Sequence, residues 1–375
     1  MRVNPDINSG NPIGMGMGAA CMYQGSRTTA SSYLENAPSN LTIAVNSPVA
    51  KVIMSGKQAR GIKTIEGKEY FAKKDVILSG GALNSPQLLM LSGIGPADEL
   101  QKHGIPVVHE LPNIGKHLQD HCFATATLLQ KPGTNDRMTY ETDEKAVAAA
   151  RAQHTKDKTG ILSEMYCSTP MGWFKNDKVL ESEEYKALDK HTQEHIRKAT
   201  VPVFEIATHT PPLFTGDYEL KPTDCYLTAL GFVMSKCFQF ESYIRVLTRG
   251  IDPQSEGEVT LNSANPSDAP NVDPKLLSHP FDRRVIIEAM RSMMNYLEAP
   301  VFKKNTVKMI GCPKSRSDED IWVGSTTPSL APMTDKIRTI VQVTSSRLGI
   351  CAPPFEWGRK TKRMLVWIQI SKSEV

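Results

Sequence analysis

The stretch Gly81-Ala-Leu-Asn-Ser-Pro-Gln-Leu-Leu-Met-Leu-Ser-Gly-Ile-Gly95 decides how this chain is interpreted. The apolar run at residues 75–78, just before it, is typical of a buried strand. Gly80 and Gly81 then remove two Cβ atoms, so the backbone can turn sharply and another group can approach it closely. The stretch therefore predicts a strand followed by a glycine turn.

A helix is predicted to follow this turn. Asn84 or Ser85 supplies the N-cap, and Pro86 suits the first helical position. Gly93 and Gly95 end the helix, because glycine tolerates positive φ. A strand, a glycine turn and a helix start can hold a nucleotide, but a glycine pair before a helix is more often an ordinary tight connection.

The full string of residues 81–95 supports the nucleotide-binding interpretation. Residues 81–95 resemble, position for position, the second signature of the glucose-methanol-choline (GMC) family of FAD-dependent oxidoreductases. Residues 111–121 resemble a further family motif, from which Asn113 and His117 depart, and residues 255–282 resemble the start of the GMC C-terminal region. The resemblance implies an α/β FAD-binding domain, Rossmann-like and incomplete, and an α+β substrate domain with an antiparallel sheet.

The resemblance also implies domain bounds and a cofactor site. A partial FAD-binding domain is expected over 1–124, the substrate domain and the start of the C-terminal region over 125–310, and a diverged tail over 311–375. FAD is the implied cofactor. The residues implied to bind it are Val49, Gly80, Gly81, Ala82, Asn84, Asp120 and His121.

Two of these assignments have alternatives. The family pattern gives the Val49 backbone amide a contact with the FAD adenine, whereas an ordinary buried strand valine explains the residue nearly as well. Asp120 and His121 could be read as an acid/base pair. Adjacent residues rarely face the same point, so we expect them to lie on the cofactor side without proton chemistry, and no catalytic residue is predicted.

The remaining patterns predict elements around the signature. Strands at 41–45, 49–53 and 59–65 would form a meander, and Tyr226 to Arg249 two or three further strands. A short helix at 97–104 precedes an edge-like strand at 105–108. Charged residues at 182–198 indicate a solvated helix, and an amphipathic helix is expected at 281–297, with His279 in a structural turn before it.

Composition excludes several classes of protein. Of 375 residues, 40% are hydrophobic and 22% charged, with a net charge of +4, which is typical of a globular chain. Seven cysteines without a Cys-x-x-Cys pair favour reduced thiols over a disulfide framework or zinc site. His191 and His195 have ligand spacing but lack a third ligand, so surface histidines are the better interpretation and no metal is expected.

The sequence also gives no sign of a nucleic-acid partner, a membrane span or a secretory signal. The basic run 359–363 lacks aromatic interleaving and a nucleic-acid module, and the longest apolar run, 227–234, is far too short for a membrane span. The first residues have no apolar segment typical of a secretory signal. We therefore expect a cytoplasmic protein, and the family resemblance implies a small-molecule alcohol as its substrate.

The family pattern is incomplete in this chain. Gly14-x-Gly16-x-Gly18 does not follow a strand, so it does not meet the dinucleotide fingerprint, and no histidine occurs after His279 to serve as the base. The resemblance is expected to end after Trp322. The predicted function is FAD-dependent oxidation of an alcohol CH–OH group, as in dehydrogenases of fungal biosynthetic pathways; the alternative is a truncated, non-catalytic family remnant.

Overall fold

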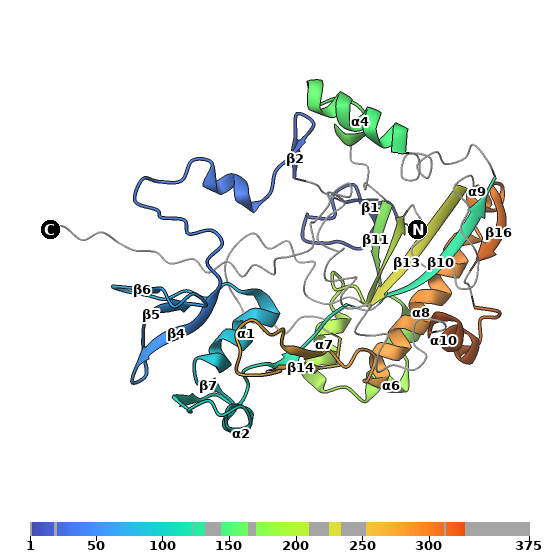
Figure 1. Cartoon of the computed structure of the whole chain (residues 1–375). Helices are drawn as coiled ribbons and strands as arrows, with labels where there is room; N and C mark the ends of the chain where they lie inside the picture. Colours follow the sequence, from blue (N-terminus) through green and yellow to red (C-terminus); the bar gives the residue numbers. More distant parts are fainter. Residues whose placement is uncertain are drawn as a thin grey trace. The chain divides into compact units, whose positions relative to one another are not determined.

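The structure is a computed structural model and describes residues 2–18, 21–121, 123–131, 144–163, 170–209, 225–233, 253–310 and 313–326 (Figure 1). These residues form two compact units. The sheet unit contains the described residues before 30, from 121 to 254 and from 277 onward. The signature unit contains residues 30–120 and 255–276. Within the described ranges, no helix is long and apolar enough to cross a membrane.

A six-stranded antiparallel sheet organises the sheet unit. Its strands lie in the order β1, β11, β12, β13, β10, β16, and every neighbouring pair is antiparallel. The bounds are β1 (Gly14–Met17), β11 (Pro170–Phe174), β12 (Phe204–His209), β13 (Cys225–Val233), β10 (Phe123–Gln130) and β16 (Thr306–Ile310). The predicted antiparallel sheet is confirmed; of the strands expected at 226–249, residues 234–249 lie outside the described residues.

Helix α8 (Pro280–Leu297) packs on one face of this sheet (Figure 1). Its buried side chains join Phe204 and Ile206 of β12 in one apolar core. The His279 ring Nδ1 accepts a hydrogen bond from the Phe281 N–H at 3.1 Å and so caps the helix. The amphipathic helix and the structural role of His279 are both confirmed.

The solvated helix predicted at 182–198 is wrong in detail, because the segment is broken in two. Helix α6 (Glu183–Lys186) begins at an N-cap Ser182, and α7 (Lys190–Arg197) begins at a second N-cap, Asp189. Each cap side chain accepts a backbone N–H, and this local bond competes with a continuous helix. Other elements of the unit are α4 (Glu144–Asp157), α5 (Asp177–Leu180), α9 (Pro300–Lys303), α10 (Asp318–Thr326), β2 (Met22–Tyr23), β3 (Ser26–Arg27) and the 3₁₀ helix η2 (Ile161–Ser163).

The signature unit contains the predicted meander, displaced along the sequence. Strands β4 (Val49–Ser55), β5 (Gln58–Thr64) and β6 (Glu69–Phe71) pair antiparallel. The expected strand at 41–45 is wrong, because that segment pairs with no strand in the described ranges and its Ile43 and Val45 side chains are exposed. β-branched residues favour a strand only where a neighbouring strand accepts them. The unit's 3₁₀ helix η1 covers Ala30–Leu34.

Two further strand predictions fail for the same reason. Residues 75–80 form no regular element and pair with no strand among the described residues. Val76 and Leu78 pack on the core of the unit, whereas Ile77 is 51% exposed. Residues 105–108 form no strand either: β8 is His109–Glu110 and pairs in parallel with β7 (Ile94–Gly95).

Helix α1 (Gly81–Leu91) begins earlier than the caps predicted. Gly80 is its N-cap, Asn84 lies inside its first turn and a half, and Pro86 lies inside the helix instead of at its first position. Because Pro86 has no N–H, the bond to the carbonyl of Ala82 is missing, which is tolerated near a helix start. Helix α2 (Ala97–Lys102) confirms the short helix predicted after the signature.

Candidate functional site

The glycine turn forms an open helix start. Gly81 has φ +77°, a left-handed conformation that glycine adopts without strain, and a Cβ added there would meet no atom within 4 Å. The first turn of α1 has no acidic residue and no side-chain cap. Its N–H groups and the positive end of the helix dipole therefore suit the electron-rich oxygens or ring of a cofactor such as FAD.

Ser92 fixes the C-terminal end of α1 to strand β4 of the meander. Its hydroxyl donates to the Leu88 carbonyl at 2.6 Å and accepts from the Val52 N–H on β4 at 2.8 Å. All three residues are buried. Gly93 follows with φ +81°, and a Cβ there would lie 2.5 Å from the Pro106 carbonyl oxygen. Ser92 and Gly93 of the signature thus hold α1 against strand β4. The sequence analysis did not predict this role.

The motif at 111–121 pairs with the distant segment 255–262. Strand β9 (Lys116–Leu118) lies beside β14 (Gly257–Thr260), which also pairs with β15 (Asn271–Asp273). The Val259 N–H donates to the Gly115 carbonyl at 2.7 Å, and a Cβ on Gly115 would lie 2.2 Å from the Val259 oxygen. Only glycine fits so close an approach.

His117, one of the two departures from the family motif, has a conformational explanation. Its φ is +59°, in the left-handed region where asparagine is common and histidine is also enriched. Its ring Nδ1 contacts the Glu256 carboxylate, while the neighbouring Lys116 pairs with Glu258. The hydrogen bond from Lys116 is the main cause that lowers the pKa of Glu258.

Side-chain hydrogen bonds join helices α1 and α2 to the distant segment 255–276. The Gln87 amide of α1 donates to the Asp268 carbonyl at 2.7 Å. The Glu99 carboxylate of α2 accepts from the Leu261 N–H at 2.8 Å. Segments about 180 residues apart in the chain are therefore held together within the signature unit.

Six of the seven predicted cofactor residues lie in the signature unit. They are Val49, the turn residues Gly80, Gly81, Ala82 and Asn84, and Asp120. The Val49 side chain is 4% exposed and packs with Val52 and Leu88. His121, half-buried, is counted with the sheet unit. The cofactor contacts assigned to these residues stay predictions.

Sequence reasoning also missed a buried carboxyl group in the sheet unit. Glu205 on β12 is 2% exposed and lies opposite Trp173 on β11. Burial raises its pKa to about 7, and the hydrogen bond from the Trp173 indole N–H only partly opposes the increase. The signal was an acidic residue within the apolar run 203–207.

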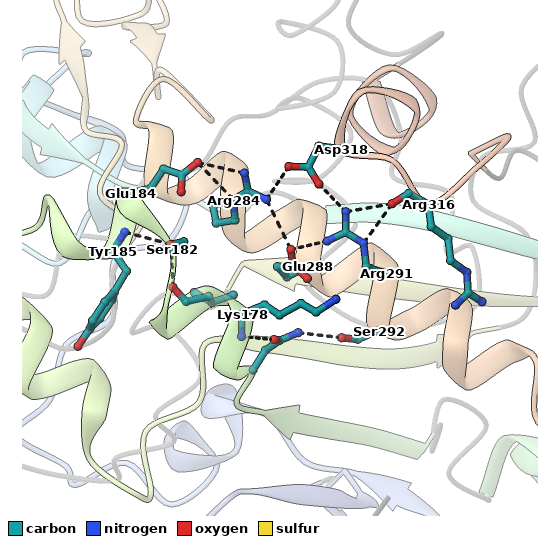
Figure 2. Close-up of polar contacts among 12 residues, drawn as sticks. Lys178, Ser182, Glu184, Tyr185, Arg284, Glu288, Arg291, Ser292, Arg316 and Asp318 are labelled. Atoms are coloured by element: carbon teal, nitrogen blue, oxygen red, sulfur yellow. Dashed lines mark hydrogen bonds and ion pairs between the residues drawn. The ribbon is translucent and has the colours of Figure 1, made fainter.

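Helix α8 anchors α10 and α6 through an ion-pair network (Figure 2). Arg284 pairs with Glu184 at 3.2 Å and with Asp318 at 2.7 Å. Arg291 pairs with Glu288 and with the same Asp318. Burial alone would raise the pKa of Asp318, but hydrogen bonds from both arginines outweigh it and keep that pKa low. The network fixes the start of α10 on α8.

The described residues contain no cluster of three or more histidine, cysteine, aspartate or glutamate side chains that could hold a metal ion. His191 is exposed and His195 half-buried on α7.

Comparison with known sequences identifies the family. A sequence model described as GMC oxidoreductase matches residues 1–123, and a second model with the same description matches residues 253–340. The second match continues past Trp322, where the resemblance was expected to end.

Two curated relatives match most of the chain, and a third matches a shorter part at higher identity. It is 29% identical over 327 residues to the alcohol dehydrogenase [acceptor] of Pseudomonas putida, covering 85% of this chain and 52% of that protein. It is 27% identical over 303 residues to versicolorin B synthase of Aspergillus parasiticus, covering 78% and 43% respectively. Human mitochondrial choline dehydrogenase is 46% identical over 122 residues, which is 31% of this chain and 20% of that one.

Solved structures give the same fold. A formate oxidase superposes with a TM-score of 0.71 at 24% identity, covering 86% of this chain and 55% of the other. Pyridoxine 4-oxidase of Mesorbium loti gives 0.61 at 20% identity, covering 86% of this chain and 54% of that one. The chain thus spans about half the length of the first curated relatives and the formate oxidase.

These matches agree with the three strings that the signature unit brings together. FAD is the cofactor of the matched family, which confirms the predicted cofactor, and the fold is that of FAD-binding GMC flavoenzymes with helices and antiparallel sheets. The chain is a member of the GMC oxidoreductase family.

Proposed function

We propose that this chain forms part of an FAD-dependent oxidoreductase that acts on the CH–OH group of a small alcohol. The observation that carries the proposal is the open, uncapped start of α1, which Ser92 holds on β4. Two curated relatives are named for alcohol or choline oxidation. A biosynthetic role is supported by the similarity to versicolorin B synthase.

The roles of the two units follow from this proposal. The signature unit, residues 30–120 and 255–276, would belong to a Rossmann-like FAD-binding domain, and the sheet unit would provide the substrate domain. Gly80, Gly81, Ala82 and Asn84 would hold the cofactor at the helix start. The Val49 backbone amide would contact its adenine, and Asp120 and His121 would lie on the cofactor side. The bound flavin would supply hydride acceptance, and the chain's own residues would position the alcohol and remove its proton.

The experiment is FAD binding measured by visible absorption of the purified chain. We expect flavin bands that persist after removal of free FAD. Gly81→Val should abolish them, because valine is strained at φ +77° and its side chain fills the open space above the turn. Gly56→Val is the matched control: Gly56 has φ +57° and equally open surroundings, but it lies in the β4–β5 turn. Equal FAD retention in both variants would refute the assigned turn.

A non-catalytic family member is the second candidate. A general base contributes roughly 10²- to 10⁴-fold to such a reaction, so its loss alone would leave little turnover. The two candidates differ in one readout: a chain that binds FAD but reduces it no faster with an alcohol than without one is the non-catalytic form.

A further inference from the structure

Residues 51–75, which contain most of the meander and the chain just after it, carry the net positive charge of the protein. They include seven lysine or arginine residues and three acidic residues, a net charge of +4, which equals the net charge of the whole chain. The remaining residues are therefore balanced in charge. Such a local excess of cations produces a positive potential that attracts anionic surfaces.

Strand pairing gathers four exposed cations of this segment at one end of the meander, where the β4–β5 turn lies. Strand β6 runs back to this end, because Phe71 lies opposite Gly61 on β5. The Ala72 N–H then donates to the Arg60 carbonyl at 2.8 Å and so keeps the chain beside the turn. The four cations, here called the basic end, are Lys57, Arg60, Lys73 and Lys74.

A single acidic residue of the segment adjoins the basic end. Glu66 belongs to the β5–β6 turn, at the opposite end of the meander. Glu69, on β6, forms an ion pair with Lys63 at 3.1 Å. The third acidic residue, Asp75, directly follows the basic end in the sequence. The segment therefore places four cations beside one carboxylate, and this end of the meander keeps an excess of positive charge.

An aromatic side chain also projects at this end. Tyr70 packs on the core of the signature unit that contains Val52. Successive side chains of a strand point to opposite faces, so Phe71 projects away from that core. Phe71 is 58% exposed, and its cross-strand neighbour Gly61 has no side chain to cover the ring. An exposed ring beside cationic side chains is typical of a surface that lies at the boundary between a membrane and water.

We propose that the basic end and Phe71 bind the surface of a membrane that contains anionic phospholipids. The four cations contact the phosphate and carboxylate groups of the lipids, and the ring of Phe71 enters between the head groups. This contact is peripheral and needs no membrane-spanning helix. A nucleic acid suits the surface less well, because stacking of successive bases needs several exposed rings. The inference is independent of the proposed function, since it involves neither FAD nor an alcohol.

The test is co-sedimentation of the full chain with vesicles of phosphatidylcholine, with or without about 30% phosphatidylserine. We expect binding only to the vesicles that contain phosphatidylserine, and its loss at about 0.5 M NaCl, because salt screens the attraction. Each cation near an anionic membrane contributes about fivefold to the partition coefficient. The triple variant Lys57→Gln, Arg60→Gln, Lys74→Gln should therefore bind roughly 100-fold more weakly. Phe71→Ser should weaken binding about tenfold without changing the charge.

The matched control removes three exposed lysines of the sheet unit, in the triple variant Lys178→Gln, Lys190→Gln, Lys303→Gln. It changes the net charge equally and should bind as the wild type does.

Equal loss of binding in the two triple variants would overturn the inference, because net charge alone would then explain the attraction. Failure of the wild-type chain to sediment with phosphatidylserine vesicles at low salt would overturn it as well. Binding to a DNA duplex or to polyglutamate without binding to vesicles would assign the basic end to a nucleic acid or an acidic protein instead. The wild-type comparison of the two lipid compositions keeps the test decisive even if a variant does not fold.

Discussion

The bond between Ser92 and β4 gives the sharpest prediction about the signature unit. Ser92→Ala removes the hydroxyl that accepts from the Val52 N–H at 2.8 Å and donates to the Leu88 carbonyl at 2.6 Å. Leu88 keeps its helical partner, the Ser92 N–H at 3.1 Å, so its carbonyl stays satisfied. The Val52 N–H, in a residue 5% exposed, loses the hydroxyl that it bonds.

The magnitude follows from that buried donor. An unsatisfied buried N–H costs about 1–3 kcal/mol, and we expect about 2 kcal/mol here. Amide hydrogen exchange resolved by mass spectrometry measures it locally, because the peptide covering 49–55 reports on β4. A loss of about 2 kcal/mol corresponds to a roughly 30-fold increase in exchange if β4 opens by local unfolding.

The matched control is Ser55→Ala at the exposed end of the same strand, which should change the exchange by less than a factor of about 2. Unchanged protection of β4 in Ser92→Ala would refute the claim that this hydroxyl holds α1 on the meander. An equal effect in Ser55→Ala would refute it as well.

Three further predictions concern other parts of the chain. His117→Asn should leave the thermal midpoint of unfolding nearly unchanged, whereas His117→Val should destabilise by about 1–2 kcal/mol, because a β-branched residue is strained at φ +59°. Asp318→Asn weakens both arginine contacts of Arg284 and Arg291 and should raise exchange in the α10 peptide; the cost is about 1 kcal/mol, since Asp318 is partly exposed. For Glu205, the folded pKa of about 7 exceeds the ordinary 4.5, so the folded chain keeps a proton that the unfolded chain releases. Stability to urea should therefore fall by roughly 3 kcal/mol from about pH 4.5 to 7 and then level off, and Glu205→Gln should lack this component.

Local sequence signals predicted the helices whose capping and patterning residues lie within the helix or next to it. The amphipathic period and the capping residues at 279–297 are sufficient for α8, and the acidic first turn and glycine stop are sufficient for α2. The same reasoning misplaced the start of α1, because it gave the N-cap to Asn84 or Ser85 on their side-chain preference. The observed cap, Gly80, uses backbone conformation instead.

Strand predictions failed where stability depends on a partner. Residues 41–45 and 75–78 have strand composition, yet neither pairs with a strand among the described residues. By contrast, β4 and β5 are joined by a two-residue turn and supply partners to each other. Strand propensity therefore shows only that a segment could pair with a neighbouring strand. The fold decides whether such a strand is adjacent.

The candidate site shows a similar division between what a sequence pattern can and cannot reveal. The signature named the open turn at Gly81, but no local pattern indicates that Gly115 must approach Val259, more than 140 residues later, within a distance that excludes any side chain. Glu205 was missed for the opposite reason. An acidic residue in a strand normally marks the solvent face, and its burial becomes visible only when β11 places Trp173 across from it.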